Sequence, residues 1–132
     1  MSMKIEEGTL DQEQVVMEII VNAGEARSLC FESLQLARKG QLEEARAKVQ
    51  QSRECINQAH LTQTRLIELD QGEGKVPMTL VMVHAQDHLM TTIAVQELAV
   101  EMLELHARLD EQQSEQEALR ADLRALRVKG ES

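Results

Sequence analysis

Apolar residues recur every three or four positions over three long stretches of the chain, which is the spacing of one face of an α-helix. The first stretch begins near residue 11 or 12 and ends at Gly40, where a basic last turn followed by glycine is a typical stop signal. The spacing skips one step at Arg27. The predicted apolar face carries Val16, Ile20, Ala23, Cys30, Leu34 and Ala37.

Within this first helix, residues 22–26 read Asn-Ala-Gly-Glu-Ala and carry unusually small side chains. Glycine in a helix interior costs about 1 kcal/mol relative to alanine. Close approach of another group would offset that cost. We therefore expect a neighbouring helix, a partner or a substrate to come close here, near His84.

The second stretch runs from Leu42 to about Leu69 and repeats the helical spacing. Its predicted buried face carries Leu42, Ala45, Val49, Ser52, Ile56, Ala59, Gln63 and Leu66. Residues 70–77 contain two glycines and Pro77, which cannot continue a helix, so we predict a loop. Thr79 is placed to cap the next helix.

The third stretch starts near Leu80 and meets no glycine or proline before Gly130. One stripe follows a strict three-four alternation, which is the heptad pattern of a coiled coil. The stripe comprises Val81, His84, His88, Thr91, Val95, Leu98, Met102, Leu105, Leu109, Gln112, Gln116, Leu119, Leu123 and Leu126. Because Gln112 and Gln116 are polar, residues 110–117 form a solvated spacer, a loop between two helices, or a layer that sets the register. The amphipathic tail from 118 to 128 needs a surface to bury against.

The composition supports an all-α class. With 132 residues, the chain is one domain's worth, and a partner subunit would add to its modest core. It has one Phe, no Trp and no Tyr, so the core must come from aliphatic residues and the numerous methionines, which suits packed helices. Three methionines lie near the two histidines of the third helix, and they suit either core filling or a surface that docks two partners: Met78, Met82 and Met90.

The net charge of −9 argues against nucleic acid or anionic lipid as the main partner and favours a basic protein. Cys30 and Cys55 lie in helical patterns without CxxC spacing, which indicates small buried residues in a reducing compartment. The N-terminal residues show no apolar signal region, and no apolar run reaches membrane-spanning length. We expect a soluble cytoplasmic protein.

Three ionisable residues interrupt the third apolar stretch: His84, Asp87 and His88. On a helix they project from adjoining parts of one face. A hydrolytic zinc site is disfavoured, because its general base would follow the first histidine and Ala85 stands there. A phosphoryl-carrier histidine fits better. Surface or subunit-contact histidines fit as well, so spacing alone leaves the function open.

Residues 83–91, Val-His-Ala-Gln-Asp-His-Leu-Met-Thr, are preceded by Gly-Lys-Val at 74–76 and followed by Glu-Leu pairs at 97 and 104. This arrangement closely resembles the IIA component of the lactose/N,N'-diacetylchitobiose/cellobiose class of the bacterial phosphoenolpyruvate-dependent sugar phosphotransferase system. Segments 22–29, 40–45 and 59–64 are similar to that family's segments in the same order. The resemblance covers about Gln14 to Leu109.

The resemblance implies a three-helix antiparallel bundle, spectrin-repeat-like with up-down-up order, that assembles into a homotrimer. It also implies a phosphotransferase in which one histidine accepts phosphate from HPr and passes it to a cysteine of the IIB component, while the membrane IIC permease moves the sugar. By match to the family motif, His84 is the phosphoryl acceptor and His88 a supporting group. Asp87 matches the metal-binding aspartate near the trimer axis, where three copies would share one divalent cation, expected to be Mg²⁺.

Three parts of the chain are therefore expected: a flexible N-terminus at 1–11, a IIA-type domain at 12–109 and a C-terminal helical extension at 110–132. The extension lies beyond the resemblance and would lengthen the trimer contact or fold back on the bundle, and we expect it to add oligomer stability. The alternative function is a helical adaptor or regulatory protein that acts by binding alone. The sugar stays open between diacetylchitobiose, cellobiose and lactose, with the loop at 72–75 favouring the first two.

Overall fold

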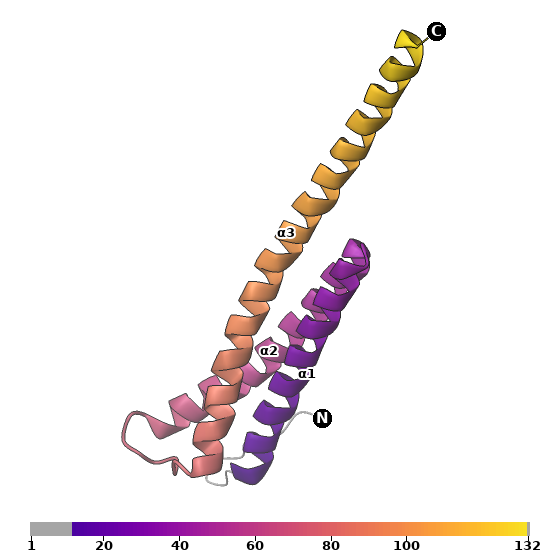
Figure 1. The fold of residues 1–132 in the computed structure, drawn as a ribbon. Helices are drawn as coiled ribbons and strands as arrows, with labels where there is room; N and C mark the ends of the chain where they lie inside the picture. Colours follow the sequence, from indigo (N-terminus) through magenta and orange to yellow (C-terminus); the bar gives the residue numbers. More distant parts are fainter. Residues whose placement is uncertain (1–11, 132) are drawn as a thin grey trace.

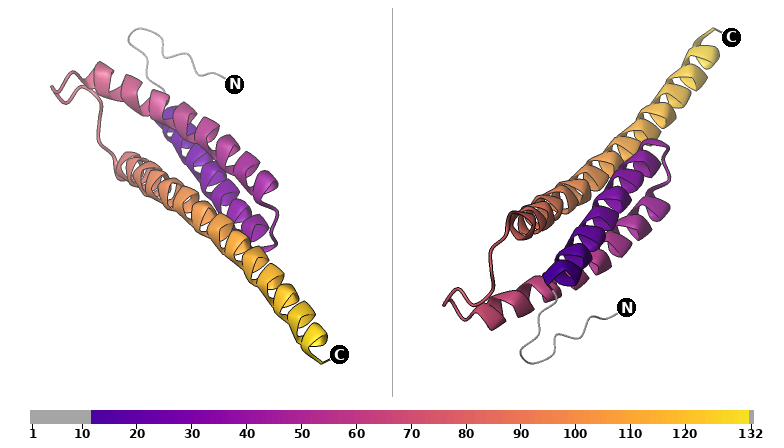
Figure 2. Two further views of the ribbon diagram at one scale, coloured as in Figure 1. Left: turned by 90° about the horizontal axis from the view of Figure 1, so that it is seen from above. Right: turned by 90° about the horizontal axis from the view of Figure 1, so that it is seen from below.

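The computed structural model describes residues 12–131, which form three helices and no strand within that range. The helices are α1 (Gln12–Arg38), α2 (Leu42–Asp70) and α3 (Leu80–Gly130). They run up, down and up, with α1 and α2 as a hairpin and α3 alongside (Figures 1 and 2). The predicted all-α, three-helix bundle is confirmed. The prediction for residues 1–11 lies outside the described residues.

Helix α1 is the central element of the bundle, because it contacts both other helices more extensively than these contact each other. Its buried face is broader than the sequence predicted. Ile20 and Leu34 are only half-buried, and the face extends to Ile19, Ala26 and Ser33. Ser33 lies where α1 meets α2, and its hydroxyl donates a hydrogen bond to the carbonyl of Ala45 at 2.8 Å.

Helix α2 buries the face that the sequence predicted, except that Leu42 is half-buried. The turn before it depends on Gly40, whose φ of 77° lies in the left-handed region that favours glycine. There the amide of Gly40 donates to the carbonyl of Ala37 and the amide of Gln41 to that of Leu36, both at 3.0 Å. The predicted stop at Gly40 is confirmed.

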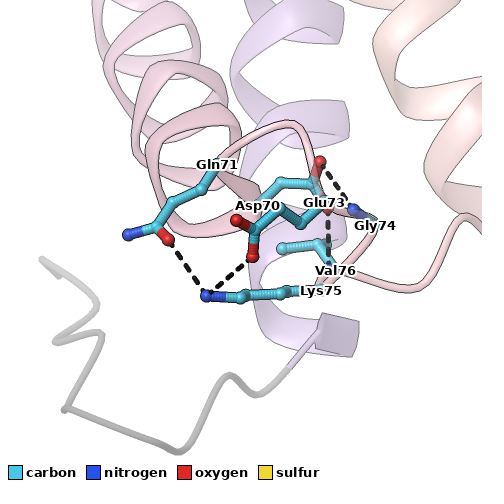
Figure 3. A network of polar contacts seen from close by, with 6 residues as sticks. All are labelled: Asp70, Gln71, Glu73, Gly74, Lys75 and Val76. Atoms are coloured by element: carbon cyan, nitrogen blue, oxygen red, sulfur yellow. Dashed lines mark hydrogen bonds and ion pairs between the residues drawn. The ribbon is translucent and has the colours of Figure 1, made fainter.

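The predicted loop between α2 and α3 is organised by one carboxylate (Figure 3). Asp70 accepts hydrogen bonds from the amides of Gly74 at 3.4 Å and Val76 at 2.9 Å. These bonds turn the loop inward, so that Val76 packs in the apolar core. The hydroxyl of Thr79 then accepts a hydrogen bond from the amide of Met82 at 3.2 Å, which confirms the predicted cap of α3.

Helix α3 carries two different stripes along its length. The stripe that packs on α1 and α2 comprises Met82, Ala85, Leu89, Thr92, Gln96, Ala99 and Leu103. The heptad stripe predicted from the sequence lies beside it, and its leucines are exposed in the single chain. The chain's own core therefore uses the stripe beside the predicted one.

Beyond the hairpin, α3 continues as one unbroken helix that projects away from the bundle (Figure 1). All residues from 111 to 131 are exposed. This excludes a loop between two helices at 110–117, and it excludes a tail that folds back on the bundle. Over residues 12–131, no helix is both long enough and apolar enough to cross a membrane.

Candidate functional site

The histidines and the aspartate singled out from the sequence lie in the second and third turns of α3. His84 and Asp87 are exposed, whereas His88 is half-buried. The two imidazole rings are nearly parallel, with planes 6° apart and centroids 6.3 Å apart. The turn therefore presents one ring to an incoming partner and holds a second ring close behind it.

Helix α1 provides the neighbour of His88. A Cβ atom at Gly24 would lie 3.8 Å from the Nε2 atom of His88, so the small residues of α1 border this ring. The expected close approach to segment 22–26 is found, but the group that comes close is His88 rather than His84. A shallow depression of ≈ 450 Å³ opens at this place. It is lined by Gly24, Arg27, Ser28, Phe31, Glu32, Gln35 and His88.

Arg27 is a basic group that the sequence analysis did not assign to the site. Its guanidinium carbon lies 5.6 Å from the ring centroid of Phe31, a cation–π arrangement that orders the side chain at the edge of the depression. The sequence signal was the step skipped in the apolar face of α1. Arg27 also follows Gly24 by three residues, which places both on the same side of the helix.

The other motif residues fix this turn of α3 to the rest of the bundle. Ala85 is fully buried in the core cluster. Gln86 accepts a hydrogen bond from the side-chain amide of Gln63 on α2. The motif thus contacts both neighbouring helices while leaving His84 and Asp87 facing outward.

The methionines of this region divide between the two roles considered for them. Met82 is 1% exposed and belongs to the core cluster, whereas Met78 and Met90 are 65% and 54% exposed. The two exposed side chains lie on either side of His84 along the chain. They add apolar, adaptable surface at the N-terminal end of α3.

Asp87 has no set of metal-ligating neighbours among residues 12–131 of its own chain. In the part of the chain that the structure describes, no three His, Cys, Asp or Glu side chains are grouped closely enough to hold a metal ion. A cation bound at Asp87 would need further ligands from other copies of the chain or from water.

Neither cysteine is suited to act as the nucleophile. Both thiols are free, Cys30 buried and Cys55 half-buried. Burial raises the pKa of Cys30, and a hydrogen bond with Ser52 offsets this in part. Burial and the nearby carboxylate of Glu25 raise the pKa of Cys55. Because the thiolate is the reactive form, both side chains are poor nucleophiles.

An exposed imidazole on a helical bundle, with a second ring 6.3 Å away and an arginine lining the depression beside that second ring, is the arrangement expected of a histidine phosphoryl carrier. The family model described as "PTS system, Lactose/Cellobiose specific IIA subunit" matches residues 14–107. The chain belongs to this family, and IIA components are phosphotransferase carriers.

Relatives with assigned functions agree with this membership. The chain is 53% identical over 97 residues to the N,N'-diacetylchitobiose-specific EIIA component of Escherichia coli strain K12, a match that covers 74% of this chain and 84% of the relative. It is 43% identical over 102 residues to the lichenan-specific phosphotransferase enzyme IIA component of Bacillus subtilis strain 168, covering 77% and 93%.

Solved structures agree as well. The cellobiose-specific enzyme IIA from Bacillus anthracis has a TM-score of 0.73 at 39% identity, and the match covers 78% of this chain and 94% of that one. The IIA(Chitobiose) chain in the solution structure of the E. coli complex with HPr has a TM-score of 0.69 at 49% identity, covering 77% and 99%. The family match ends at residue 107, whereas α3 continues to Gly130.

Proposed function

We propose that this chain carries phosphate between HPr and the IIB component of a sugar phosphotransferase system, with His84 as the acceptor. The assignment rests on which residues of the motif are exposed. His84 faces outward, while Ala85, Gln86 and His88 contact the bundle. A phosphoryl acceptor must be reached in line by two partners in turn, so only an outward-facing imidazole can serve.

In the first transfer, a ring nitrogen of His84 attacks the phosphorus of phosphohistidine on HPr. The nitrogen–phosphorus bond to HPr breaks as the bond to His84 forms, and the HPr imidazole leaves as the neutral ring. In the second transfer, a cysteine thiolate of IIB attacks the same phosphorus, and the bond to His84 breaks. Both steps depend mainly on position and electrostatics, because the transferred group is metaphosphate-like in the transition state.

The phosphorylated state adds roughly two negative charges to a chain whose net charge is already −9. Three groups around His84 and His88 would offset them. The N-terminus of α3 begins at Leu80, about one turn before His84, and its positive end favours an anion. Arg27 supplies a cation at the depression, and His88 supplies a ring N–H donor directly behind the acceptor. We assign His88 this supporting role.

We further propose that the chain assembles into a homotrimer through the part of the exposed α3 stripe that follows the two histidines, from Val95 onward, so that His84 stays accessible to its partners. Within the bundle, this stripe includes Leu98, Met102 and Leu105, which are 59%, 45% and 58% exposed. A continuous apolar stripe of this kind marks a protein interface. Its heptad spacing suits packing of α3 against α3 around an axis.

Asp87 lies at the edge of this stripe and is the natural place for a cation in the trimer. Three carboxylates drawn toward one axis repel one another, and burial would raise the cost further. Carboxylate oxygens are the hard ligands that Mg²⁺ prefers. We propose that one divalent cation, Mg²⁺ in solution, joins the three Asp87 side chains. Among the described residues of one chain, no group of side chains could hold the ion. The proposed site therefore needs the Asp87 side chains of the other copies.

Phosphorylation of His84 is tested with enzyme I, HPr and labelled phosphoenolpyruvate. The wild-type chain should acquire an acid-labile, base-stable adduct, and His84→Ala should acquire none. His60→Ala removes an exposed histidine of α2 and should be labelled as well as the wild type. His88→Ala should be labelled more slowly. Full labelling of His84→Ala would refute the site, and an unlabelled wild type would favour the binding adaptor instead.

The cation is tested with Asp87→Asn, which keeps the size of the side chain and removes its charge. Metal analysis of the purified trimer should give about one bound ion per three chains for the wild type and none for the variant. Sedimentation should show that the variant stays trimeric. Stoichiometric metal in Asp87→Asn would contradict the proposed ligand.

We propose a β-linked disaccharide as the transported sugar, with diacetylchitobiose or cellobiose favoured over lactose. The support is the identity to the diacetylchitobiose-specific relative, 53%, against 35% to the lactose-specific relative of Staphylococcus epidermidis. Selection of the sugar belongs to the IIC permease, and the carrier acts in the cytoplasm where HPr is found. The relative rates of transfer from the phosphorylated chain to purified IIB proteins of the three classes would test the assignment.

A further inference from the structure

The C-terminal part of α3, residues 110–130, is called the projecting segment below. It lies beyond the family match, and all of its residues from 111 onward are exposed. Its leucines at 119, 123 and 126 are 60%, 57% and 66% exposed. A single helix of this length is marginally stable in water unless one face is packed. The segment therefore needs an occupant for its apolar stripe.

The stripe keeps the heptad register of the bundle without a break. Counted from Val81 as position a, the projecting segment and the turn before it have Leu109, Gln116 and Leu123 at a positions. The d positions are Leu105, Gln112, Leu119 and Leu126. The same stripe forms the proposed trimer seam in the part of α3 that lies within the bundle. The projecting segment therefore presents its leucines toward the same neighbouring copies.

The flanking e positions change character where the bundle ends. Within the bundle they are Ala85, Thr92 and Ala99, which are at most 1% exposed because they pack on the other helices. In the projecting segment they are Gln113, Arg120 and Arg127, all exposed, and the last two are basic. These positions are thus free to take part in pairing between helices.

The g positions carry the opposite charge at the two corresponding layers, Glu115 and Asp122, and the last g position is Lys129. Three and four residues further along the same helix, both acids meet only alanine or leucine, so they have no basic neighbour at those spacings. In a parallel, in-register coiled coil, a g residue faces the e residue five positions later on the next helix. That geometry pairs Glu115 with Arg120 and Asp122 with Arg127.

An antiparallel arrangement would bring e next to e and g next to g. Arginine would then face arginine, and acid would face acid, which is unfavourable. The charge pattern therefore selects copies of the same chain, in parallel and in register. Gln112 and Gln116 form two polar layers in the seam, and polar layers of this kind specify register at a cost in stability.

We propose that the projecting segments of separate copies of this chain form a parallel, in-register coiled coil that continues the α3 seam beyond the bundle. The number of strands rests on the trimer of the proposed function. The coiled coil strengthens assembly at low protein concentration. It also fixes the relative register of the chains. Chains in register place their Asp87 side chains at the same level along the axis.

Cysteine cross-linking of the full chain tests the direction and register. Leu123→Cys places a thiol in the seam, and Ala121→Cys, two residues away, places one at the outward f position. Under mild oxidation, Leu123→Cys should give disulfide-linked dimers in high yield. Because a disulfide joins only two thiols, at most two of the three chains in a trimer can be joined. Ala121→Cys and the wild type, which keeps Cys30 and Cys55, should stay monomeric on a non-reducing gel.

Sedimentation of the same samples gives the number of chains in the assembly. It therefore distinguishes a failure of the proposed coiled coil from a failure of the proposed trimer. Trimers in which Leu123→Cys does not cross-link, or cross-links no better than Ala121→Cys, would overturn the coiled coil and leave the trimer standing. Cross-linked Leu123→Cys in an assembly of two chains would support the coiled coil and contradict the number of strands.

Charge reversal tests the e–g pairing. The double variant Arg120→Glu, Arg127→Glu should weaken association by about tenfold, measured by sedimentation velocity at low salt. Adding Glu115→Arg and Asp122→Arg restores opposite charges and should restore association. A fourfold variant as weak as the double variant, or equal association of all proteins, would refute the pairing.

Labelling of His84 is the internal control for folding. At a rise of about 1.5 Å per residue, Arg120 lies roughly 54 Å along the helix from His84. These variants should therefore accept phosphate from HPr as the wild type does.

Discussion

The two halves of α3 carry the same heptad stripe but surround it differently. Inside the bundle, the stripe borders a second, buried row that contains Ala85 and Ala99. Beyond the bundle, the same angular positions hold Arg120 and Arg127. The apolar stripe alone therefore does not show whether a given part of a long helix packs within its own chain or against other copies. The residues beside the seam show where the helix packs on its own chain and where, in the proposed coiled coil, it packs on other copies.

The comparison also separates two kinds of stability. The bundle half of α3 is buried whether or not other copies are present, because its contacts are with α1 and α2. The projecting half buries its leucines only on association. Substitutions in the first half should act at every protein concentration, and substitutions in the second half should act through mass action.

The largest effect is expected from truncating one leucine in each half. Leu89 is fully buried, so Leu89→Ala should lower the free energy of unfolding by about 3 kcal/mol at every protein concentration. Leu119→Ala should lower it by an amount that depends on concentration. Denaturant titrations followed by circular dichroism at two concentrations measure both. Equal, concentration-independent losses would remove the distinction between the halves.

A stabilising change should follow from filling a polar layer of the projecting half. Gln116→Leu replaces one polar seam residue by an apolar one in every chain. It should strengthen association by about 2 kcal/mol per chain. Ser114→Leu adds the same side chain at an outward position and should not. Dissociation measured by dilution and light scattering compares the two. A larger gain from Ser114→Leu would place the seam elsewhere.

A smaller effect concerns the start of α3, which is fixed within the chain rather than by other copies. Thr79→Ala removes the cap on the amide of Met82 and should cost about 1 kcal/mol of unfolding free energy. Thr79→Ser keeps the hydroxyl and should be nearly neutral. Thermal unfolding of the three proteins provides the measurement. Losses of equal size in both variants would mean that packing of the threonine methyl, rather than the cap, is what matters.

The smallest effect is the titration of Cys30 in the core. Burial raises its pKa above the ordinary value of 9.0, so the folded chain keeps the proton to higher pH than the unfolded chain does. Its contribution is fully present below pH 9.0, and stability is lost as pH rises through the folded-state pKa. Unfolding free energies measured on either side of this pH should fall less steeply for Cys30→Ala. An unchanged slope would show that the thiol does not contribute.

Periodicity predicted the buried face of α2 because apolar residues coincide there with the face that packs inside the chain. It failed to single out the core face of α3, which contains Thr92, Gln96 and two alanines. Both stripes of α3 carry apolar residues at helical spacing, and the heptad pattern selects the one whose leucines the chain leaves exposed. Burial within a chain and burial between chains look alike in a sequence.

The site was predicted in part for a similar reason. Helical spacing placed His84, Asp87 and His88 on neighbouring parts of one face, and the structure agrees. Spacing could not show which histidine contacts α1, because that depends on Gly24, far away in the sequence. Arg27 was missed as a site residue since only the packing of α1 against α3 brings it to the edge of the same depression as His88.

The unbroken course of α3 also bears on how this protein can be handled. His84 and the end of the helix at Gly130 lie at opposite poles, roughly 69 Å apart along the helix axis. In a parallel assembly, all chains present the same pole in the same direction. A fluorophore or a surface tether attached at the C-terminal pole would therefore orient every His84, the proposed acceptor, toward free solution, so that docking of partner proteins can be observed on immobilised molecules.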